Sequence, residues 1–462
     1  IRRPPTSTLL PNTTLFRSVQ SLPSARIAFP GEVSFHTENL SGEVVELARD
    51  LGPGWSIRRE AVAVAAGPFE SQLLAEQNMS RWPASLGPAF VSREAEGFFI
   101  VGGVFSSSEE AGVGLSQLSS AGLIGPRVRG AHHLRSEASF SREEAMLLAA
   151  TLRSLGVHSA RPVYDGTFRL AAGYAADFDG LWAVLQQIKQ LVPHVAMQAV
   201  APDFRRIDVV SNDGRTILTY DIMPGMPLRV APVGPGILSL EGRQHRGVYE
   251  FLQTADLRFT VVSIMDVEDY LRAVVPREMP ALWHSEALKA QAVVVRTFTQ
   301  ATRGRHAALG FDLCTFSSCC QAYGGVEWEH SNSTAAVEAT RGVMLFVAGR
   351  PAVTFYHADS GGYTEHNHNV WNGAPLSHLI GVPDPFPAMA GSPHANWTVT
   401  LSQADLGRIL SSNSINVGTV QRLEVAQRTA AGRVAVLVVH GSLGRVQLVR
   451  QQPRLFNGSA SA

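Results

Sequence analysis

A glutamate enclosed by prolines is the first feature of this sequence that could do chemistry. Glu278 lies between Pro276 and Pro280 in the segment VVPREMPALWHSEALKAQAVVVRTFTQ. Proline fixes φ and disfavours the α region for the residue before it, so we expect a short, stiff loop that holds the carboxyl group in place. Such a group suits general acid and base catalysis. The alternative is a solvated charge, the commoner role of a loop glutamate.

Three cysteines and a histidine form a second candidate site. Cys314, Cys319 and Cys320 are the only cysteines of the chain, and His306 precedes them. Thiolates and imidazole at short spacing suit tetrahedral zinc, and four protein ligands predict a structural site. The alternatives are a vicinal disulfide between Cys319 and Cys320, or buried free thiols.

Polar and aromatic residues in two later stretches predict a sugar-binding surface. A Ser-Gly-Gly turn leaves backbone N–H groups open and lets a substrate approach closely, and tyrosine rings can stack on sugars. The predicted substrate-binding residues are Gln321, Tyr323, Tyr356, His357, Ser360, Gly361, Gly362 and Thr364. For each of them the alternative is a tight turn with ordinary surface polar groups. A serine hydrolase is disfavoured, because the Gly-x-Ser-x-Gly nucleophile elbow is missing around Ser360.

The elements around these residues indicate an α+β fold, because strands and helices do not alternate regularly. A helix is expected from Glu286 to about Arg303, with Ser285 as its cap. RRIDVVSNDGRTILTYD predicts a β-hairpin, and VMLFVAG and AVTFYHAD predict a strand pair. The inward face of the long helix is expected to hold Ala287, Ala290, Val294, Phe298 and Ala301.

Upstream, a weak internal repeat predicts two small βα modules over residues 95–195. FFIVGGVFSSSEEAGVGLSQL starts at Phe98, and FRLAAGYAADFDGLWAVLQQI starts at Phe168. Each copy predicts a strand, a glycine, an acidic turn and an amphipathic helix. The equivalent helical positions are Ala111, Leu115 and Leu118 in the first copy and Leu181, Leu185 and Ile188 in the second. A β-rich region over 25–88 precedes the repeat, and a larger domain over 205–450 follows it.

Both ends of the chain are expected to lie outside the fold. Residues 1–18 resemble a translated sequencing adapter, the alternative being a Pro/Thr-rich disordered tail, and 455–462 are also expected to be disordered. We therefore expect the true N-terminus, with an export signal, to be missing from this sequence.

Composition excludes several classes of function. Lys plus Arg and Asp plus Glu both count 39, so the formal net charge is zero and nucleic acid is not an expected partner. Three clustered cysteines are no disulfide framework for 462 residues. No run of about 18 apolar residues predicts a transmembrane helix. A chain of this length is expected to form two or three domains.

Several motifs in order resemble the stage II sporulation protein D family. VEDYLRAVVPREMPALWHSEALKAQAVVVRTFTQ carries the resemblance, followed by DLCTFSSCCQAYGG, TFYHADSGGYTE, LIGVPDPFP and SPHANWTV. The resemblance covers roughly 205–450 and implies that Glu278 is catalytic. It also implies zinc held by two Cys and two His, with Cys319 standing where the family more often has His. The upstream repeat is similar to the sporulation-related repeat, which binds peptide-free peptidoglycan glycan; an ordinary βα unit without a ligand is the alternative.

The resemblance implies a peptidoglycan lytic transglycosylase, a lyase that works outside the cytoplasm at the wall or anchored to the membrane. One carboxyl group suffices there, because the sugar's own C6 hydroxyl replaces water and the product is a 1,6-anhydro sugar. The alternative is a non-catalytic amidase enhancer, with a cell-wall amidase as partner. The predicted groove residues supply no Arg or Lys for stem-peptide carboxylates, so glycan stripped of peptides is the expected substrate.

Overall fold

The computed structural model describes most of the chain. The described residues are 13–22, 24–39, 41–59, 62–87, 89–94, 97–105, 108–130, 132–175, 181–201, 206–253, 259–371, 373–392, 398–450, 452 and 456. Residues 1–12, the middle of the SPHANWTV motif (393–397) and most of the predicted disordered tail (455–462) lie outside them. Contacts divide the chain into two compact units, 1–345 and 346–462, so the predicted 205–450 domain spans parts of both.

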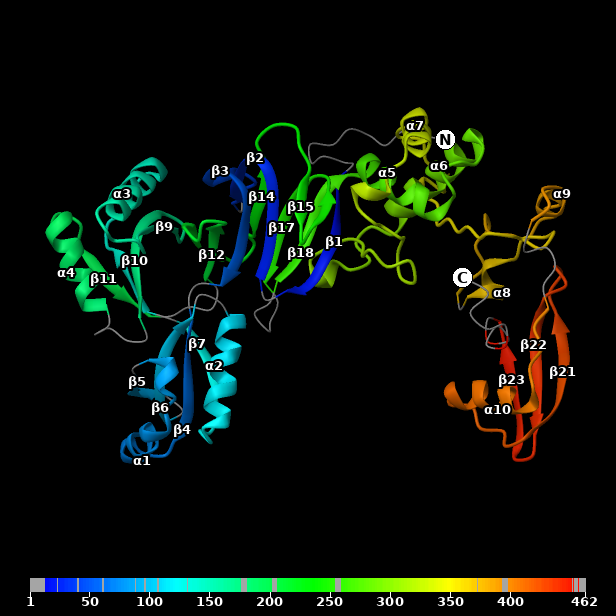
Figure 1. The fold of residues 1–462 in the computed structure, drawn as a ribbon. Helices are drawn as coiled ribbons and strands as arrows, with labels where there is room; N and C mark the ends of the chain where they lie inside the picture. The colour runs from blue at the N-terminus through cyan, green and yellow to red at the C-terminus, as the bar shows by residue number, and fades with distance from the viewer. Residues whose placement is uncertain are drawn as a thin grey trace. The chain divides into compact units, whose positions relative to one another are not determined.

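A 14-stranded sheet organises the first unit (Figure 1). Its main path runs β1-β18-β17-β14-β2-β3-β12-β13-β9-β10-β8-β11, with β15 paired to β2 and to β16. The strands outside the repeat are β1 (Thr13–Leu22), β2 (Ser24–Glu38), β3 (Val44–Arg59), β12 (Arg206–Ser211), β13 (Thr216–Asp221), β14 (Leu228–Pro232), β15 (Leu238–Leu240), β16 (Arg243–His245), β17 (Val248–Gln253) and β18 (Phe259–Asp266). Inward alternation along these strands buries one core, whose large members include Phe35, Trp55, Tyr220 and Phe251.

This sheet corrects two expectations about the N-terminal region. Residues 13–18 do not lie outside the fold, because they form part of β1, which pairs antiparallel with β18. Residues 25–88 are not one region: β2 and β3 lie inside the large sheet, whereas β4 starts a separate four-stranded sheet. The predicted hairpin is confirmed as β12 and β13, whose turn contains Gly214 at φ +84°.

The predicted repeat over 95–195 is too short: its two βα copies, β6–α2 and β10–α4, are the second halves of two larger modules, over 62–130 and 132–200, that share the β-α-β-β-α-β order. The first contains β4 (Val62–Phe69), α1 (Gln72–Asn78), β5 (Ala89–Glu94), β6 (Gly97–Phe105), α2 (Ser108–Ser120) and β7 (Arg127–Gly130). The second contains β8 (His132–Ser136), α3 (Arg142–Ser154), β9 (Arg161–Tyr164), β10 (Phe168–Ala175), α4 (Trp182–Leu191) and β11 (Met197–Val200). Their strand orders, β5-β6-β4-β7 and β9-β10-β8-β11, correspond strand for strand, and the second module joins the large sheet where β9 pairs with β13.

The repeated helical positions face the two module cores. Ala111 and Leu118 of α2 are buried against β4 and β6, and Ile188 of α4 is buried against β10, with Leu181 just before the helix. Leu115 and Leu185 pack against the same cores. Each helix thus contributes an apolar stripe at helical spacing, as the repeat predicted.

Three helices and a long irregular segment follow β18. They are α5 (Val267–Glu278), α6 (Ser285–Ala301) and α7 (Ser331–Ala339), with 3-10 turns at Ala307–Leu309 and Val326–Trp328. The side chain of Asp266 caps α5 by accepting the Glu268 N–H. The predicted cap of α6 is wrong: Ser285 is its first helical residue, and the ring of His284 accepts the Glu286 N–H.

The predicted inward face of α6 is also largely wrong. Phe298 is buried, but Ala290 is exposed and the other three predicted residues are half-buried. The buried stripe instead runs through Leu288, Ala292 and Val295 and includes polar residues. Apolar periodicity missed this face because Gln291 and Arg296 lie on it.

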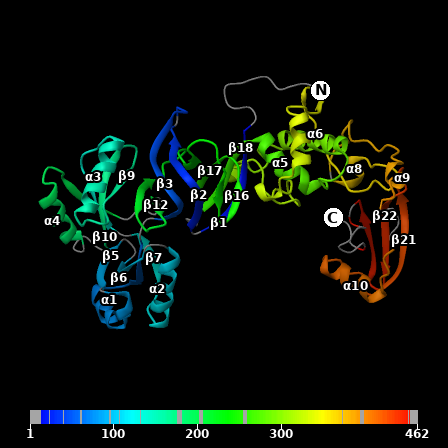
Figure 2. The same ribbon diagram turned by 45° about the horizontal axis from the view of Figure 1, so that its top comes forward.

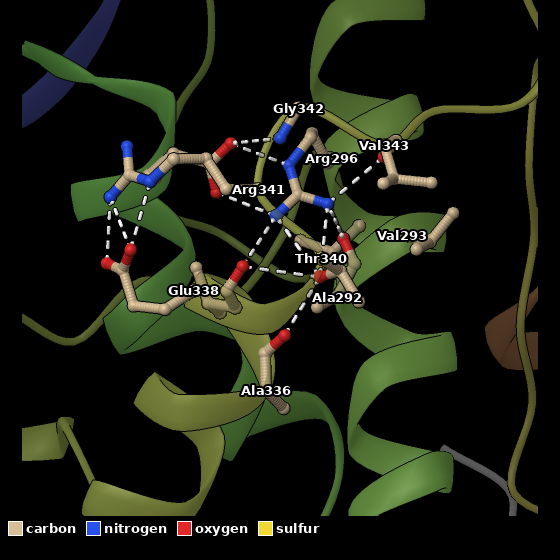
Figure 3. Close-up of polar contacts among 12 residues, drawn as sticks. Ala292, Val293, Arg296, Ala336, Glu338, Thr340, Arg341, Gly342 and Val343 are labelled. Atoms are coloured by element: carbon tan, nitrogen blue, oxygen red, sulfur yellow. Dashed lines mark hydrogen bonds and ion pairs between the residues drawn. The ribbon is translucent and has the colours of Figure 1, made fainter. Parts of the chain in front are cut away.

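An ion pair in the interior explains the buried arginine (Figure 3). Arg296 Nε and Nη2 donate to the two carboxylate oxygens of Glu268 at 2.8 and 2.6 Å, and the two side chains are 1% and 2% exposed. Arg296 also donates to the carbonyls of Val337 and Val343, while the Gly342 N–H donates to Glu268. One pair of charges thereby connects α5, α6 and the end of α7.

The second unit consists of short elements and a small sheet. Its elements are β19 (Phe346–Val347), β20 (Arg350–Pro351), α8 (Asn367–Val370), α9 (Phe386–Met389), α10 (Gln403–Ser412), β21 (Val420–Arg428), β22 (Val434–Gly441) and β23 (Gly444–Val449). Figures 1 and 2 show α10 beside the three-stranded sheet, where Leu410 packs with Val439 and Leu448. The predicted strand pair shrinks to two residues on each side, because residues 352–359 form no strand.

The α+β prediction is confirmed: helices and strands are both abundant and fall into several sheets. Among the helices in the described part of the chain, none has the length and apolar character needed to cross a bilayer.

Candidate functional site

Glu278 is the last residue of α5 rather than part of a loop. The helix continues through Pro276, which lacks the N–H for one backbone hydrogen bond. It closes with the Met279 N–H donating to the Val275 carbonyl, because Pro280 disfavours a further helical residue before it. The predicted loop was wrong, but the backbone that carries Glu278 is still fixed.

A second chain segment fixes the carboxyl group itself. Oε1 of Glu278 accepts the backbone N–H of Ala322 at 3.0 Å, and the side chain is half-buried. Within the described residues, Oε2 has no hydrogen-bond partner. The arrangement therefore anchors one oxygen and leaves the other available for proton exchange with a bound molecule.

Gln321 and Tyr323, on either side of Ala322, lie in the interior. Gln321 is 1% exposed, and its Oε1 accepts the Thr299 hydroxyl at 3.0 Å. The Tyr323 ring is stacked with those of Tyr270 and His245, with centroids 5.2 and 5.7 Å away and planes tilted by 19° and 26°. Tyr323 is only 8% exposed, so this tyrosine does not offer the sugar-stacking face that the sequence suggested.

Burial also sets the electrostatics of this stack. It raises the pKa of Tyr323 far above its usual value, and it lowers the pKa of His245 to about 4. Both rings are therefore neutral near pH 7. The stack supports the segment that holds Glu278 without adding a charge to it.

The predicted metal ligands come together in space. The ligand atoms of His306, Cys314, Cys319 and Cys320 all lie within 4.8 Å of one another. His306 Nε2 is 3.4 Å from Cys319 Sγ and 3.5 Å from Cys320 Sγ, and the two sulfurs are 3.9 Å apart. Zn–S and Zn–N bonds of about 2.3 and 2.0–2.1 Å place tetrahedral ligands about 3.8 Å apart for two sulfurs and about 3.5 Å for sulfur and nitrogen. The donor set and its spacing fit zinc.

Local contacts shape this cluster. Asp312 accepts the Gly304 N–H at 3.0 Å and pairs with Arg303. Arg305 donates to the carbonyl of Cys319, while the N–H groups of Cys319 and Cys320 donate to the carbonyl of Phe316. All three cysteines are free thiols in the structure. Burial raises the pKa of the Cys320 thiol to about 12, so its thiolate requires a nearby cation.

The backbone N–H groups of the Ser-Gly-Gly turn are not as predicted. Gly361 and Gly362 adopt φ +61° and +92°, which only glycine accepts readily. Their N–H groups are engaged, because Gly361 donates to Asp359 Oδ1 at 2.6 Å and Gly362 to Ser360 Oγ at 3.2 Å. The expectation of open backbone donors here is therefore wrong.

The other predicted residues of this stretch also belong to the second unit. The Thr364 N–H donates to the Val382 carbonyl, and its hydroxyl accepts the Val382 N–H at 2.8 Å, so Thr364 joins two chain segments. Tyr356 is half-buried and His357 is exposed. Gln321 and Tyr323 are the predicted substrate-binding residues of the first unit, and they flank the Ala322 N–H that Glu278 accepts.

Arg277, directly before Glu278, is a further candidate functional residue that no sequence motif indicates. The guanidinium carbon of Arg277 lies 4.0 Å from the centroid of the Trp328 ring, and Trp328 is 49% exposed. Arg277 directly precedes the predicted catalytic residue, yet nothing in the local pattern connects it with an aromatic ring some fifty residues later.

Comparisons with known proteins agree with this geometry. The α+β fold, the anchored carboxyl group and the Cys3His cluster describe a domain with one candidate acid/base beside a candidate metal site. Residues 255–346, which include Glu278 and all four cluster residues, match the family model described as Stage II sporulation protein. This match confirms the predicted resemblance to the stage II sporulation protein D family for this part of the chain.

Three relatives show the extent of the similarity. The chain is 32% identical over 239 residues to the amidase enhancer of Bacillus subtilis (strain 168), which covers 51% of this chain and 32% of that protein. It is 28% identical over 205 residues to stage II sporulation protein D of Bacillus amyloliquefaciens, covering 41% and 58%. It is 30% identical over 196 residues to an uncharacterized protein of Brachyspira hyodysenteriae (strain ATCC 49526 / WA1), covering 42% and 52%. The chain thus spans 32% to 58% of the length of these relatives.

Proposed function

We propose that this protein is a peptidoglycan lytic transglycosylase in which Glu278 acts as both acid and base. The observation that carries the proposal is the carboxyl group itself, anchored through Oε1 by the Ala322 N–H with Oε2 unpartnered among the described residues. Its position inside the matched family region supports the assignment.

One carboxyl group can serve both steps of this reaction. Protonated Glu278 gives its proton to the glycosidic oxygen as the bond to C1 breaks. The resulting carboxylate accepts the proton of the C6 hydroxyl of the same sugar as O6 bonds to C1. The enzyme returns to its starting state, and the product carries a 1,6-anhydro ring without consuming water.

Purified protein incubated with glycan strands tests this function. Mass spectrometry should find fragments that end in 1,6-anhydro sugars, each lighter by one water than a hydrolysis product. Strands that remain uncut, or fragments with ordinary reducing ends, would rule out the transglycosylase.

The amidase enhancer of Bacillus subtilis favours a second candidate function, because it is the relative with 32% identity. In that case the chain binds wall without cutting it and stimulates an amidase. Adding the protein to an amidase assay separates the two functions: an enhancer raises the release of peptides and leaves the glycan strands at their original length, and it does so even as the Glu278→Gln variant.

We also propose one structural zinc held by His306, Cys314, Cys319 and Cys320. The spacing of the donor atoms supports a tetrahedral ion, and four protein ligands leave no open position for catalysis. Because Gln321 directly follows Cys320, the ion would fix the start of the segment that supplies the Ala322 N–H to Glu278.

The two βα modules fit the same setting. Their shared topology supports the proposal that they hold peptide-free glycan strands, in keeping with the sporulation-related repeat. The protein would then act outside the cytoplasm, with peptidoglycan as substrate and a wall amidase as partner. Pull-down of the protein with stripped and intact wall particles tests this placement.

A further inference from the structure

The side chains of Arg277 and Glu278 both contact the segment from Ala322 to Trp328. Glu278 accepts the Ala322 N–H, and Arg277 stacks on Trp328, six residues further on. Trp328 also packs against the backbone at Gly324, where a Cβ atom would clash with the Trp328 ring. The exposed arginine is thus held next to the candidate acid/base by a packed ring.

The guanidinium of Arg277 pairs with no carboxylate among the residues that the structure describes. Within the part of the chain that the structure describes, Arg277 makes no ion pair or hydrogen bond. The two glutamates that flank Trp328 are otherwise engaged: Glu329 forms a two-point pair with Arg246 at 2.7 and 2.8 Å, and Glu327 accepts the Gln244 N–H.

Stacking on the ring prepares this group for a ligand. A guanidinium that lies over an aromatic face keeps its N–H groups in its own plane, where they point outward. Such a fork matches a carboxylate with two parallel hydrogen bonds. A cation at a helix C-terminus also interacts favourably with the helix dipole. That interaction alone would require neither the Trp328 ring nor exposed N–H donors.

We propose that Arg277 is a specificity-determining residue that binds the lactyl carboxylate of the muramyl sugar. This inference rests on the proposed function. Once the stem peptide is removed, the lactyl group of that sugar ends in a free carboxylate, whereas in intact wall it is tied up as an amide. The same ring carries the C1 bond that is cleaved, so neighbouring residues of α5 would contact one sugar. Arg277 then makes stripped glycan the preferred substrate.

Chemically matched substrates test the assignment. Stripped strands are compared with the same strands after carbodiimide coupling has turned their carboxylates into neutral methylamides, and with intact peptidoglycan. Wild-type protein should cut the free acid with a kcat/KM roughly tenfold or more above that of the methylamide, the range expected for a charge-assisted hydrogen bond. Arg277→Gln should cut both at one similar, slow rate, and Arg277→Lys should fall between.

The controls separate binding from folding. Arg26→Gln, which removes an exposed arginine paired with Glu241, should keep the wild-type ratio. Unchanged melting temperatures show that the variants are folded. A retained preference for the free acid in Arg277→Gln would overturn the proposal. Loss of activity on intact wall alone would also overturn it, because the carboxylate would then belong to the stem peptide.

A binding experiment tests the role of Arg277 independently of the proposed transglycosylase activity. Calorimetry compares the two kinds of strand with protein carrying Glu278→Gln, with and without Arg277→Gln. If no preparation cuts glycan but the free acid still binds more tightly through Arg277, the catalytic proposal fails and the specificity proposal stands. Equal binding of both strands to protein with Arg277 present would refute it.

Discussion

Glu278 combines two fixed points, the end of a helix and a backbone donor from a distant segment. We predict that Glu278→Gln keeps the fold but lowers the formation of anhydro products by at least 10²-fold, because a carboxamide keeps the size and cannot transfer the proton. Product formation by mass spectrometry and the melting temperature measure the two effects. Glu286→Gln, which changes an exposed glutamate paired with Lys289, is the matched control. Near-normal activity in Glu278→Gln would exclude its catalytic role.

The Cys3His cluster predicts the metal content of the protein. Protein purified without chelator should contain about one zinc per chain. Cys314→Ser should lose that metal and melt at a lower temperature, because a buried hydroxyl replaces a thiolate ligand. Elemental analysis and thermal melts record both. An apoprotein whose mass spectrum shows a Cys319 to Cys320 disulfide would contradict the site.

Burial of His245 predicts a dependence of stability on pH. Its pKa falls from 6.5 to about 4 on folding, so between those values the unfolded chain binds more protons than the folded one. The free energy of unfolding therefore decreases as pH falls from about 6.5 to 4, by up to roughly 3 kcal/mol from this residue.

Urea unfolding across this pH range measures the effect. His245→Phe keeps a ring against Tyr323 and should flatten the decrease, whereas His194→Gln, at an exposed position, should leave it in place. A slope that is identical in wild type and His245→Phe would show that another group is responsible.

For single residues, the sequence predicted which side chains form the candidate sites better than it predicted their contacts. The proline-flanked Glu278 and the close cysteines carry their signal in local spacing. The Ala322 N–H that contacts Glu278 and the Trp328 ring that contacts Arg277 leave no such local signal, because each contact depends on packing between segments some forty to fifty residues apart. The Gly361 turn was misjudged although Asp359 offered a signal: an Asx side chain often accepts a backbone N–H two residues on.

Among the elements, α5 and α6 depend on the Arg296–Glu268 pair. We predict that Arg296→Met lowers the free energy of unfolding by roughly 3–5 kcal/mol, because it leaves the Glu268 carboxylate buried without its cation. The double variant with Glu268→Leu should recover a large part of that loss. Denaturant unfolding of the four proteins in this cycle gives the coupling energy.

A surface pair provides the comparison for this cycle. Arg341→Met removes a pair with Glu338 in which the arginine is half exposed, and should cost less than about 1 kcal/mol. If Arg296→Met costs no more than Arg341→Met, the buried pair does not stabilise the helical group.

The same pair explains why element faces were harder to predict than element types. The helix over 285–301 and the β12–β13 hairpin follow from periodicity and turn residues. The buried face of α6 does not, since an arginine is an unlikely core residue until its partner on α5 is known. The short β19–β20 pair shows the converse: the apolar residues in VMLFVAG and AVTFYHAD predict two full strands, and the chain forms only two residues of each.

For the whole molecule, we predict a preference for glycan without stem peptides. The modules and the Arg277 site would both favour stripped strands. Digestion of amidase-treated peptidoglycan should therefore be faster than that of intact peptidoglycan at equal glycan concentration. Heat-inactivated amidase controls for the pretreatment, and equal or reversed rates would exclude the preference.

For the whole molecule, the internal repeat indicated the two modules, but no sequence pattern predicted the large sheet. Sequence patterns show that residues 25–59 form strands, and they do not show which strands will neighbour them. β3 pairs with β12 across the intervening residues 60–205, a long-range pairing that leaves no local signature.

That pairing sets an order of events on the ribosome. The β2–β3 ribbon is synthesised 146 residues before β12, counted from 60 to 205, and its other neighbour β14 follows later still. At about 5–20 residues per second, this interval lasts about 7–30 s. An isolated two-stranded ribbon is marginally stable, and both of its edges expose unpaired backbone groups. Nascent chains of this protein therefore pass through a period in which two strand edges that will later lie at the centre of the sheet have not yet met their partner strands.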